Sequence, residues 1–489
     1  MNIVVIGCGF GGLAAAIRLQ AQGHQVTIVD KRDKPGGRAY VYEQDGFTFD
    51  GGPTIITTPQ HLHELFELGG KRLDDYLTLV KLDPFYNVRF EDGSVFHYTD
   101  KPEEILNQIR AFNPPDEEGY RAFFKASERV LDKGLPMMNK PFLKFTDMLK
   151  VSPDMVKLQA NKSVTSFVGD YIQDEQLRQV FSFHPLLIGG NPFQSTSIYV
   201  MIHKLEQAFG IWYALGGTGA LVRALVQVFQ DLGGTLQLNT EVQQIQVNER
   251  SKRATGVVLS DDRVLSADAV VSNADVAFTY MKLIPAEFRK KWSDRKLESL
   301  TYSMSLFVLY FGTDRQYPDV AHHEILLGPR YEELMADIFD RKVLADDFAL
   351  YLHRPTATDP SMAPPGCDCW YVLAPVPNLE GDIDWTQMAK PYRDRIVQYL
   401  EERYLPDLSQ HIITEHYIDP LHFRDTLNSY RGSAFSIEPT LMQSAWFRPQ
   451  NRSEDIPNLY IVGAGTHPGA GIPGVMSSGR IVADLIGKA

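Results

Sequence analysis

The sequence has few cysteines, no long apolar run and no excess of positive charge. Three cysteines, Cys8, Cys367 and Cys369, are too few for a disulfide framework, and the last two alone do not make a metal site, so we predict no metal. The formal net charge of -13 argues against nucleic-acid binding, because phosphate contacts require a positive surface. No segment reaches the roughly 18 apolar residues of a membrane span.

The apolar start of the chain, from Ile3 to Leu19, is best explained by a buried strand and a turn. It has no basic leader and is interrupted by four glycines, which argues against a signal peptide. With 489 residues, 44% of them hydrophobic and 22% charged, the chain is expected to fold throughout into two or three substructures. We expect a cytoplasmic protein.

A glycine-rich turn lies between a predicted strand, residues 2–6, and a predicted helix, residues 13–22. It reads Gly7-Cys8-Gly9-Phe10-Gly11-Gly12, which is the GxGxxG dinucleotide-binding pattern in its strand–turn–helix context. Gly7 permits the tight turn, Gly9 lets a pyrophosphate approach the backbone, and Gly12 lets the helix pack close to the strand. The helix N-terminus offers free N–H groups to the phosphates.

An acidic residue stands where this fingerprint requires one. A second predicted strand, residues 25–29, ends at Asp30, which lies 18 residues after Gly12 (30 minus 12). A carboxylate at that place accepts hydrogen bonds from the ribose hydroxyls of adenosine. The fingerprint fits FAD and NAD alike.

The next two motifs favour FAD. They are Lys34-Pro35-Gly36-Gly37-Arg38 and Phe49-Asp50-Gly51-Gly52-Pro53-Thr54. Gly36 and Gly37 let backbone N–H groups crowd an anion, and Arg38 supplies fixed donors, although alone it fits a surface salt bridge equally well. The pattern resembles the FAD superfamily of amine oxidases and carotenoid desaturases. The resemblance implies that the double glycine and arginine extend the phosphate cradle and that the later Gly-Pro approaches the flavin.

Glycines recur before two further predicted helices. Gly216 to Gly219 precede a helix over 220–232, which is followed by a strand pair over 236–247 and 254–259 and a return strand over 269–275. The run from Gly463 to Val475 stands between a strand over 459–462 and a helix that ends at Ile486. The resemblance implies that Val242 touches the adenine through its backbone and that the last helix points at the flavin pyrimidine edge. Alone, Val242 is read as a plain strand residue.

The resemblance to bacterial carotenoid phytoene desaturases runs along essentially the whole chain. Besides the glycine motifs it rests on Phe181 to Pro192, Leu306 to Gly312, Ser433 to Pro439 and Ser444 to Pro449. It implies FAD-dependent desaturation of phytoene by successive dehydrogenations to lycopene, with the flavin as hydride acceptor. The long apolar strands over 302–311 and 370–375 would suit a lipophilic tunnel, but also an ordinary sheet core.

The expected fold is α/β, with a Rossmann-type FAD-binding domain, a discontinuous α+β substrate domain and a helical, membrane-associating subdomain. The FAD-binding domain takes residues 1–75, 216–275 and 456–489, the substrate domain 76–98 and 276–455, and the helical subdomain 99–215. The predicted cofactor residues are Gly7, Gly9, Phe10, Gly11, Gly12, Asp30, Lys31, Gly37, Arg38, Gly52, Pro53, Thr54, Val242, Gly463, Ala464, Gly465, Gly471, Ile472, Pro473 and Val475.

No catalytic base stands out. The sequence shows no triad, carboxylate pair or metal motif, and Asp147 and His467 are weak candidates. For His467, packing or a hydrogen bond to backbone is the preferred interpretation. Quinone or oxygen is the expected electron acceptor, because there is only one dinucleotide fingerprint.

Residues 133–162 combine six lysines and two aspartates, a local balance of +4, with interleaved apolar side chains. This mixture suits docking at the inner face of the cell membrane, and a solvated helix face is the alternative.

Three other functions use a similar framework. A flavin amine oxidase would be reduced by amines, and a flavin-dependent carotenoid isomerase would convert its substrate without net electron transfer. A non-catalytic escort protein for prenylated partners would not need intact flavin motifs. The number of desaturation steps, the isomer preference and the oligomeric state stay open.

Overall fold

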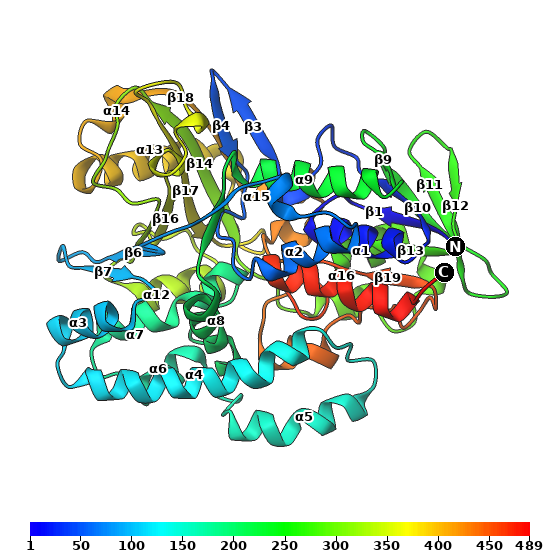
Figure 1. Ribbon diagram of the computed structural model, residues 1–489, viewed down its shortest axis with the longest axis horizontal. Helices are drawn as coiled ribbons and strands as arrows, with labels where there is room; N and C mark the ends of the chain where they lie inside the picture. The colour runs from blue at the N-terminus through cyan, green and yellow to red at the C-terminus, as the bar shows by residue number, and fades with distance from the viewer.

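Five parallel strands form the sheet that carries the N-terminal glycine turn (Figure 1). The computed structural model describes residues 1–489. The strand order is β19-β13-β1-β2-β9, with bounds Leu459–Ile461, Ala269–Ser272, Asn2–Ile6, Gln25–Val29 and Thr235–Gln237. The strands therefore come from both chain ends and from the middle of the sequence.

The two faces of this sheet are covered differently. Ile3 and Val5 of β1 pack into a core with the helices α1 (Phe10–Ala21), α9 (Gly217–Asp231) and α16 (Ile472–Ile486). Val4 and Ile6 pack against a three-stranded antiparallel sheet of β10 (Val242–Val247), β11 (Ala254–Leu259) and β12 (Val264–Ser266). Strands buried on both faces explain the continuous apolar runs of the sequence.

Two sequence-based boundaries are wrong. The first helix begins at Phe10, so Gly11 and Gly12 belong to its first turn. The predicted strand over 236–247 is two strands in different sheets: β9 pairs with β2, and β10 pairs with β11. Between them Asn239 has a positive φ of 50° and the Thr240 N–H donates to the Asp30 carbonyl, which turns the chain away from the first sheet.

A seven-stranded mixed sheet forms the second half of the molecule. Its order is β18-β14-β17-β16-β15-β6-β7, with bounds Ile412–Ile418, Ser305–Thr313, Asp368–Val376, Leu350–His353, His323–Leu326, Tyr86–Arg89 and Val95–Tyr98. Strand β14, which lies between the edge strand β18 and β17, is buried along its whole length. Helix α13 (Trp385–Arg403) packs on one face, where Phe307 of β14 lies against Trp385.

Six of the sixteen α-helices lie between β7 and β8 (Trp212–Ala214) in the sequence. They are α3 (Pro102–Phe112), α4 (Asp116–Met138), α5 (Phe145–Lys157), α6 (Val164–Gly169), α7 (Glu175–Ser182) and α8 (Met201–Phe209). Figure 1 shows α5 at the lower edge, outside α4. No residue of α5 is fully buried. None of the helices combines the length and the apolar composition needed to cross a bilayer.

Shorter elements connect these parts. They are β3 (Val41–Gln44), β4 (Phe47–Asp50), α2 (Gln60–Leu68), β5 (Leu79–Lys81), β8 (Trp212–Ala214), α10 (Val276–Phe278), α11 (Asp294–Glu298), α12 (Tyr331–Ala336), α14 (Leu408–His411) and α15 (Pro420–Asp425). The predicted α/β fold class is confirmed. The limits of the three predicted domains stay a prediction.

The packing of α16 on α1 is tight enough to test. A Cβ atom at Gly479 would lie 2.7 Å from the backbone nitrogen of Ala15 and 2.9 Å from the Cβ of Ala14. Gly479→Leu should therefore lower the free energy of unfolding by about 1–3 kcal/mol, because the two helices must separate. Denaturant unfolding followed by tryptophan fluorescence measures this change.

The matched control is Asp484→Ala on the exposed face of the same helix, which should change stability by no more than about 0.5 kcal/mol. An unfolding midpoint of Gly479→Leu equal to that of the parent would contradict the close helix contact.

Candidate functional site

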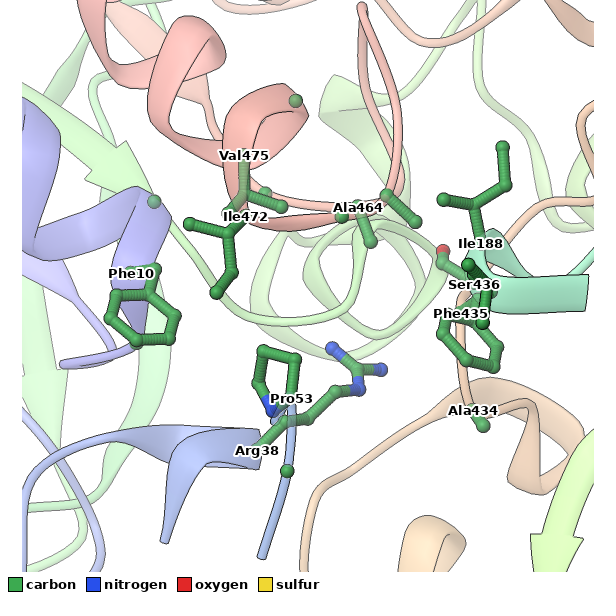
Figure 2. Close-up of a pocket in the computed structure, with 18 of the residues that line it drawn as sticks. Phe10, Arg38, Pro53, Ile188, Ala434, Phe435, Ser436, Ala464, Ile472 and Val475 are labelled. Atoms are coloured by element: carbon green, nitrogen blue, oxygen red, sulfur yellow. The ribbon is translucent and has the colours of Figure 1, made fainter. Parts of the chain in front are cut away.

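A large cavity begins at the glycine turn after β1 and reaches the helices between α4 and α8. Of the 81 residues that line it, 47 are hydrophobic, so most of its wall is apolar. Figure 2 shows Phe10 of α1 and Ile472 and Val475 of α16 on one side, with Ile188 and Phe435 on the other. Every predicted cofactor residue except Gly12 lines this cavity.

The turn after β1 is shaped by contacts that leave no room for side chains. Gly7 has a φ of +95°, which favours glycine. A Cβ atom at Gly12 would lie 2.2 Å from the Gly7 carbonyl oxygen, so Gly12 lets α1 pack onto the turn, the role predicted for it.

Asn273 is a residue of the turn that sequence reasoning missed. It directly follows β13, and its side-chain amide lies among glycines of two turns. A Cβ atom at Gly9 would lie 2.8 Å from Asn273 Nδ2, and one at Gly11 or Gly463 would lie 2.7 or 3.0 Å from Asn273 Oδ1. Its place at the carboxyl end of a buried parallel strand was the available signal.

Asp30 lies at the end of β2 and is buried at the cavity edge. Its Oδ2 accepts a hydrogen bond from the Cys8 N–H (2.7 Å), and its Oδ1 accepts one from the Arg32 N–H (2.9 Å). Each carboxylate oxygen can accept a further bond, as ribose hydroxyls require. Lys31 and Val242 line the same end of the cavity, and Lys31 Nζ donates to Asn428 Oδ1 at 2.9 Å.

Arg38 is partly buried and forms no salt bridge, so the surface-salt-bridge alternative is wrong. Its Nη2 donates to Ser429 Oγ at 2.9 Å, whereas its Nε has no partner. Asp275 acts on it electrostatically, and the Oδ2 of that carboxylate also lacks a partner. Burial raises the pKa of Asp275, and the nearby Arg38 charge opposes that rise. In Figure 2 the guanidinium of Arg38 extends into the pocket.

The C-terminal motif brings a helix N-terminus to the cavity. Gly463, Ala464 and Gly465 line it from the loop after β19, and Gly471 precedes the first turn of α16. Gly471 has a φ of +90°. The positive end of the helix dipole therefore faces the cavity, opposite Gly52, Pro53 and Thr54.

These features suit a dinucleotide with a flavin. Bare backbone at three turns leaves the space that a side chain would fill, Arg38 has a free buried donor, and Asp30 has free acceptor capacity. The family model described as flavin containing amine oxidoreductase matches residues 10–487. The chain belongs to this family. This flavin oxidoreductase uses FAD.

Two relatives and one solved structure are similar to this chain over nearly its whole length. A lycopene-forming phytoene desaturase from Pseudescherichia vulneris is 53% identical over 99% of this chain and 98% of its own length. A neurosporene-forming phytoene desaturase from Rhodobacter capsulatus is 45% identical over 99% and 93%. The structure of cyclohexylamine oxidase from Brevibacterium oxydans matches with a TM-score of 0.63 at 17% identity, covering 99% and 98%. The last comparison shows the fold alone.

The two weak candidates for a base differ in their placement. Asp147 does not line the cavity: it caps α5, accepting from the Lys144 N–H at 3.0 Å and from Lys150 at 3.3 Å. His467 lines the cavity, and its Nε2 is 3.0 Å from the Met137 carbonyl, the backbone hydrogen bond that was preferred for it. Burial lowers the pKa of His467 to about 4, so its ring is neutral at pH 7. Its Nδ1 has no partner.

The rest of the wall is mostly apolar, with one buried acid that sequence reasoning missed. Leu306 and Val308 of β14 line the cavity, whereas Phe307 and Leu309, which alternate with them, face α13. The tunnel and the sheet core predicted as alternatives are thus the two faces of one strand. Glu206 of α8 also lines the cavity, and Tyr86 Oη donates to its Oε2 at 2.7 Å.

Asp30→Ala should reduce FAD affinity roughly 10- to 100-fold, because it removes a charged acceptor that is worth about 1.5–3 kcal/mol. It also removes the partner of the Cys8 N–H and so loosens the turn. Flavin content after purification and fluorescence titration with FAD measure the effect.

Asp33→Ala is the matched control, since Asp33 lies outside the cavity and bonds the Tyr40 hydroxyl. If both variants bind FAD like the parent, Asp30 does not contact the nucleotide.

Proposed function

We propose that this flavin oxidoreductase desaturates phytoene by successive dehydrogenations to lycopene in carotenoid biosynthesis. The observation that carries the proposal is the continuous cavity, which joins the polar glycine turns to a long apolar wall. The 53% identical relative is a lycopene-forming phytoene desaturase, which supports both the substrate and the product.

The cavity wall suits a hydrocarbon. Leu306 and Val308 approach from the second sheet, Met304 from the segment just before β14, and Ile198 and Leu205 from the helical part. Such a wall binds a polyene through burial of apolar surface, at roughly 25 cal/mol per Å². It also excludes water from the reacting carbons.

Dehydrogenation removes a hydride from one carbon and a proton from its neighbour, and bound FAD supplies the hydride acceptor. The N-terminus of α16 at Gly471 and Ile472 offers N–H groups and positive potential to negative charge that develops at this end of the cavity. Thr54 Oγ1, bonded to Tyr351 Oη at 2.6 Å, adds a hydroxyl to the same wall. His467 and Glu206 are the groups in the wall placed to take up the proton.

Anaerobic mixing with liposomal phytoene should bleach the flavin of the purified protein, whereas cyclohexylamine and other simple amines should not. The absorption spectrum of the extracted polyene, with quinone supplied as acceptor, should shift to that of lycopene over repeated turnovers. Bleaching by amines alone would make the protein an amine oxidase, and conversion of the polyene without any acceptor would make it an isomerase. A product that stops at neurosporene would overturn the proposed end product.

Helix α5 suits docking at the inner face of the cell membrane, where a lipophilic substrate resides. Met148, Val151 and Met155 of α5 line the cavity. Another face of the same helix exposes Phe145, Leu149 and Val156, which are 51%, 56% and 77% exposed. The helix therefore separates the cavity from an apolar outer surface, which suits passage of a lipid-soluble substrate.

The lysines around α5 differ in whether their positive charge is already paired with an acidic side chain. Lys133 and Lys162 pair with Asp154 and Asp170, at 3.3 and 2.5 Å. Lys144 and Lys157 are exposed, and neither forms a salt bridge, so they have positive charge available for anionic lipid headgroups.

Leu149→Ser combined with Val156→Ser should reduce binding to anionic liposomes at least tenfold, because each exposed side chain contributes about 1 kcal/mol or more when buried in lipid. Lys144→Gln with Lys157→Gln should reduce it by about 1 kcal/mol per lysine, and more at low salt. Flotation assays measure both.

Val264→Ser is the control, because Val264 is 49% exposed on β12, in the other half of the molecule. Equal flotation of all these variants would show that another surface docks, and it would leave the flavin assay as a separate test of the reaction.

A further inference from the structure

Three buried histidines meet behind the cavity wall, at the ends of two neighbouring strands. His323 begins β15, His353 ends β16, and the antiparallel register pairs them directly, with His322 next to them. Their ring nitrogens come within 4.8 Å of one another. None of the three residues is more than 6% exposed.

Only two of the six ring nitrogens in this cluster have a hydrogen-bond partner. His322 Nδ1 pairs with Thr358 Oγ1 at 2.7 Å, and His323 Nδ1 pairs with Tyr351 Oη at 2.8 Å. The Nε2 atoms of both residues, and both ring nitrogens of His353, have no partner. A buried polar atom without a partner destabilises the folded protein, so the cluster is poorly explained as packing alone.

We propose that His322, His323 and His353 bind a divalent transition-metal ion of the zinc type. Neutral imidazole is a preferred ligand of such ions, whereas Mg²⁺ and Ca²⁺ require oxygen. A metal-bound histidine usually has its second ring nitrogen fixed by a hydrogen-bond partner, and the Thr358 and Tyr351 hydroxyls supply that arrangement. Tetrahedral ligation places nitrogens about 3.3 Å apart, so small side-chain rotations close the site.

The surroundings of the cluster suit a cation. Arg354 and Asp359 act on His322 with opposite charges, and the charge of Arg354 is paired with Asp368, whose Oδ2 lies 3.2 Å from Arg354 Nη1. The ring of Tyr213 lies 4.6 Å from that of His322, and its hydroxyl, which has no partner, is available to a fourth ligand such as water.

The site is connected to the cavity through a chain of two hydroxyls. With Nε2 of His323 on the metal, its Nδ1–H donates to Tyr351 Oη, which then donates to Thr54 Oγ1 at 2.6 Å. Thr54 and Tyr351 both line the cavity. The metal would thus set the direction of this chain and leave the Thr54 hydroxyl proton free for an acceptor in the cavity.

Sequence reasoning predicted no metal site, because the adjacent His322 and His323 are far from His353 in the chain and the three form no known spacing motif. The register between β15 and β16 brings them together. The proposal does not depend on which substrate the enzyme uses.

The test uses the full-length holoenzyme, depleted of metal with a chelator and titrated with Zn²⁺ and with Co²⁺. The wild type should bind one ion per chain, and Co²⁺ should give the intense visible absorption of tetrahedral ligation in a difference spectrum. His353→Ala should weaken binding about 100-fold or more, since a lost ligand costs at least as much as a lost outer partner. His63→Ala, a histidine of α2 outside the cluster, should bind like the wild type.

A second variant keeps the test valid if His353→Ala fails to fold. Tyr351→Phe retains all three ligands and removes only the hydroxyl that orients His323, so it should bind about 10- to 100-fold more weakly while retaining the tetrahedral Co²⁺ spectrum. Absence of Zn²⁺ and Co²⁺ binding by the wild type would overturn the proposal. Equal binding by wild type, His353→Ala and Tyr351→Phe would also overturn it, because the ions would then lie elsewhere.

Discussion

The close packing of bare backbone around Asn273 is the constraint on which the cofactor site depends. Its amide fits between the turn after β1 and the turn after β19, where Cβ atoms at Gly11 and Gly463 would come within about 3 Å of it. The two ends of the chain are thereby held together at the point where the nucleotide approaches. A site assembled from distant segments is positioned only as well as such contacts are.

The lining of the cavity changes from polar to apolar along its length, and this change separates the cofactor end from the substrate end. At one end Asp30, Arg38 and the helix N-termini supply charge and oriented N–H groups. Beyond Pro53 and Gly471 the wall becomes mostly apolar, and Thr54, Tyr351, His467 and Glu206 are isolated polar groups within it. Charged and hydrogen-bonding groups are therefore available where a flavin binds. The remaining wall offers mostly apolar contacts to a substrate.

The sequence predicted much of the nucleotide half and little of the second half. The strand–turn–helix motif gave β1, β2 and Asp30 because each step is local and depends on glycine geometry. Asn273, Glu206 and the three-histidine cluster could not be predicted in this way, since their neighbours are set by strand register and by helix packing over long sequence separations. The split between β9 and β10 was missed because a continuous polar–apolar pattern does not reveal a change of sheet.

The two-sided burial of β14 has a consequence for how the family can diversify. Because alternate residues face either the cavity or α13, changes at Leu306 and Val308 reshape the binding surface without entering the core around Phe307. Selection for substrates of different length can therefore act on the residues of β14 that face the cavity, while the alternate residues maintain the fold. In such a strand, neighbouring residues have different roles: one contacts the substrate cavity and the next stabilises the core.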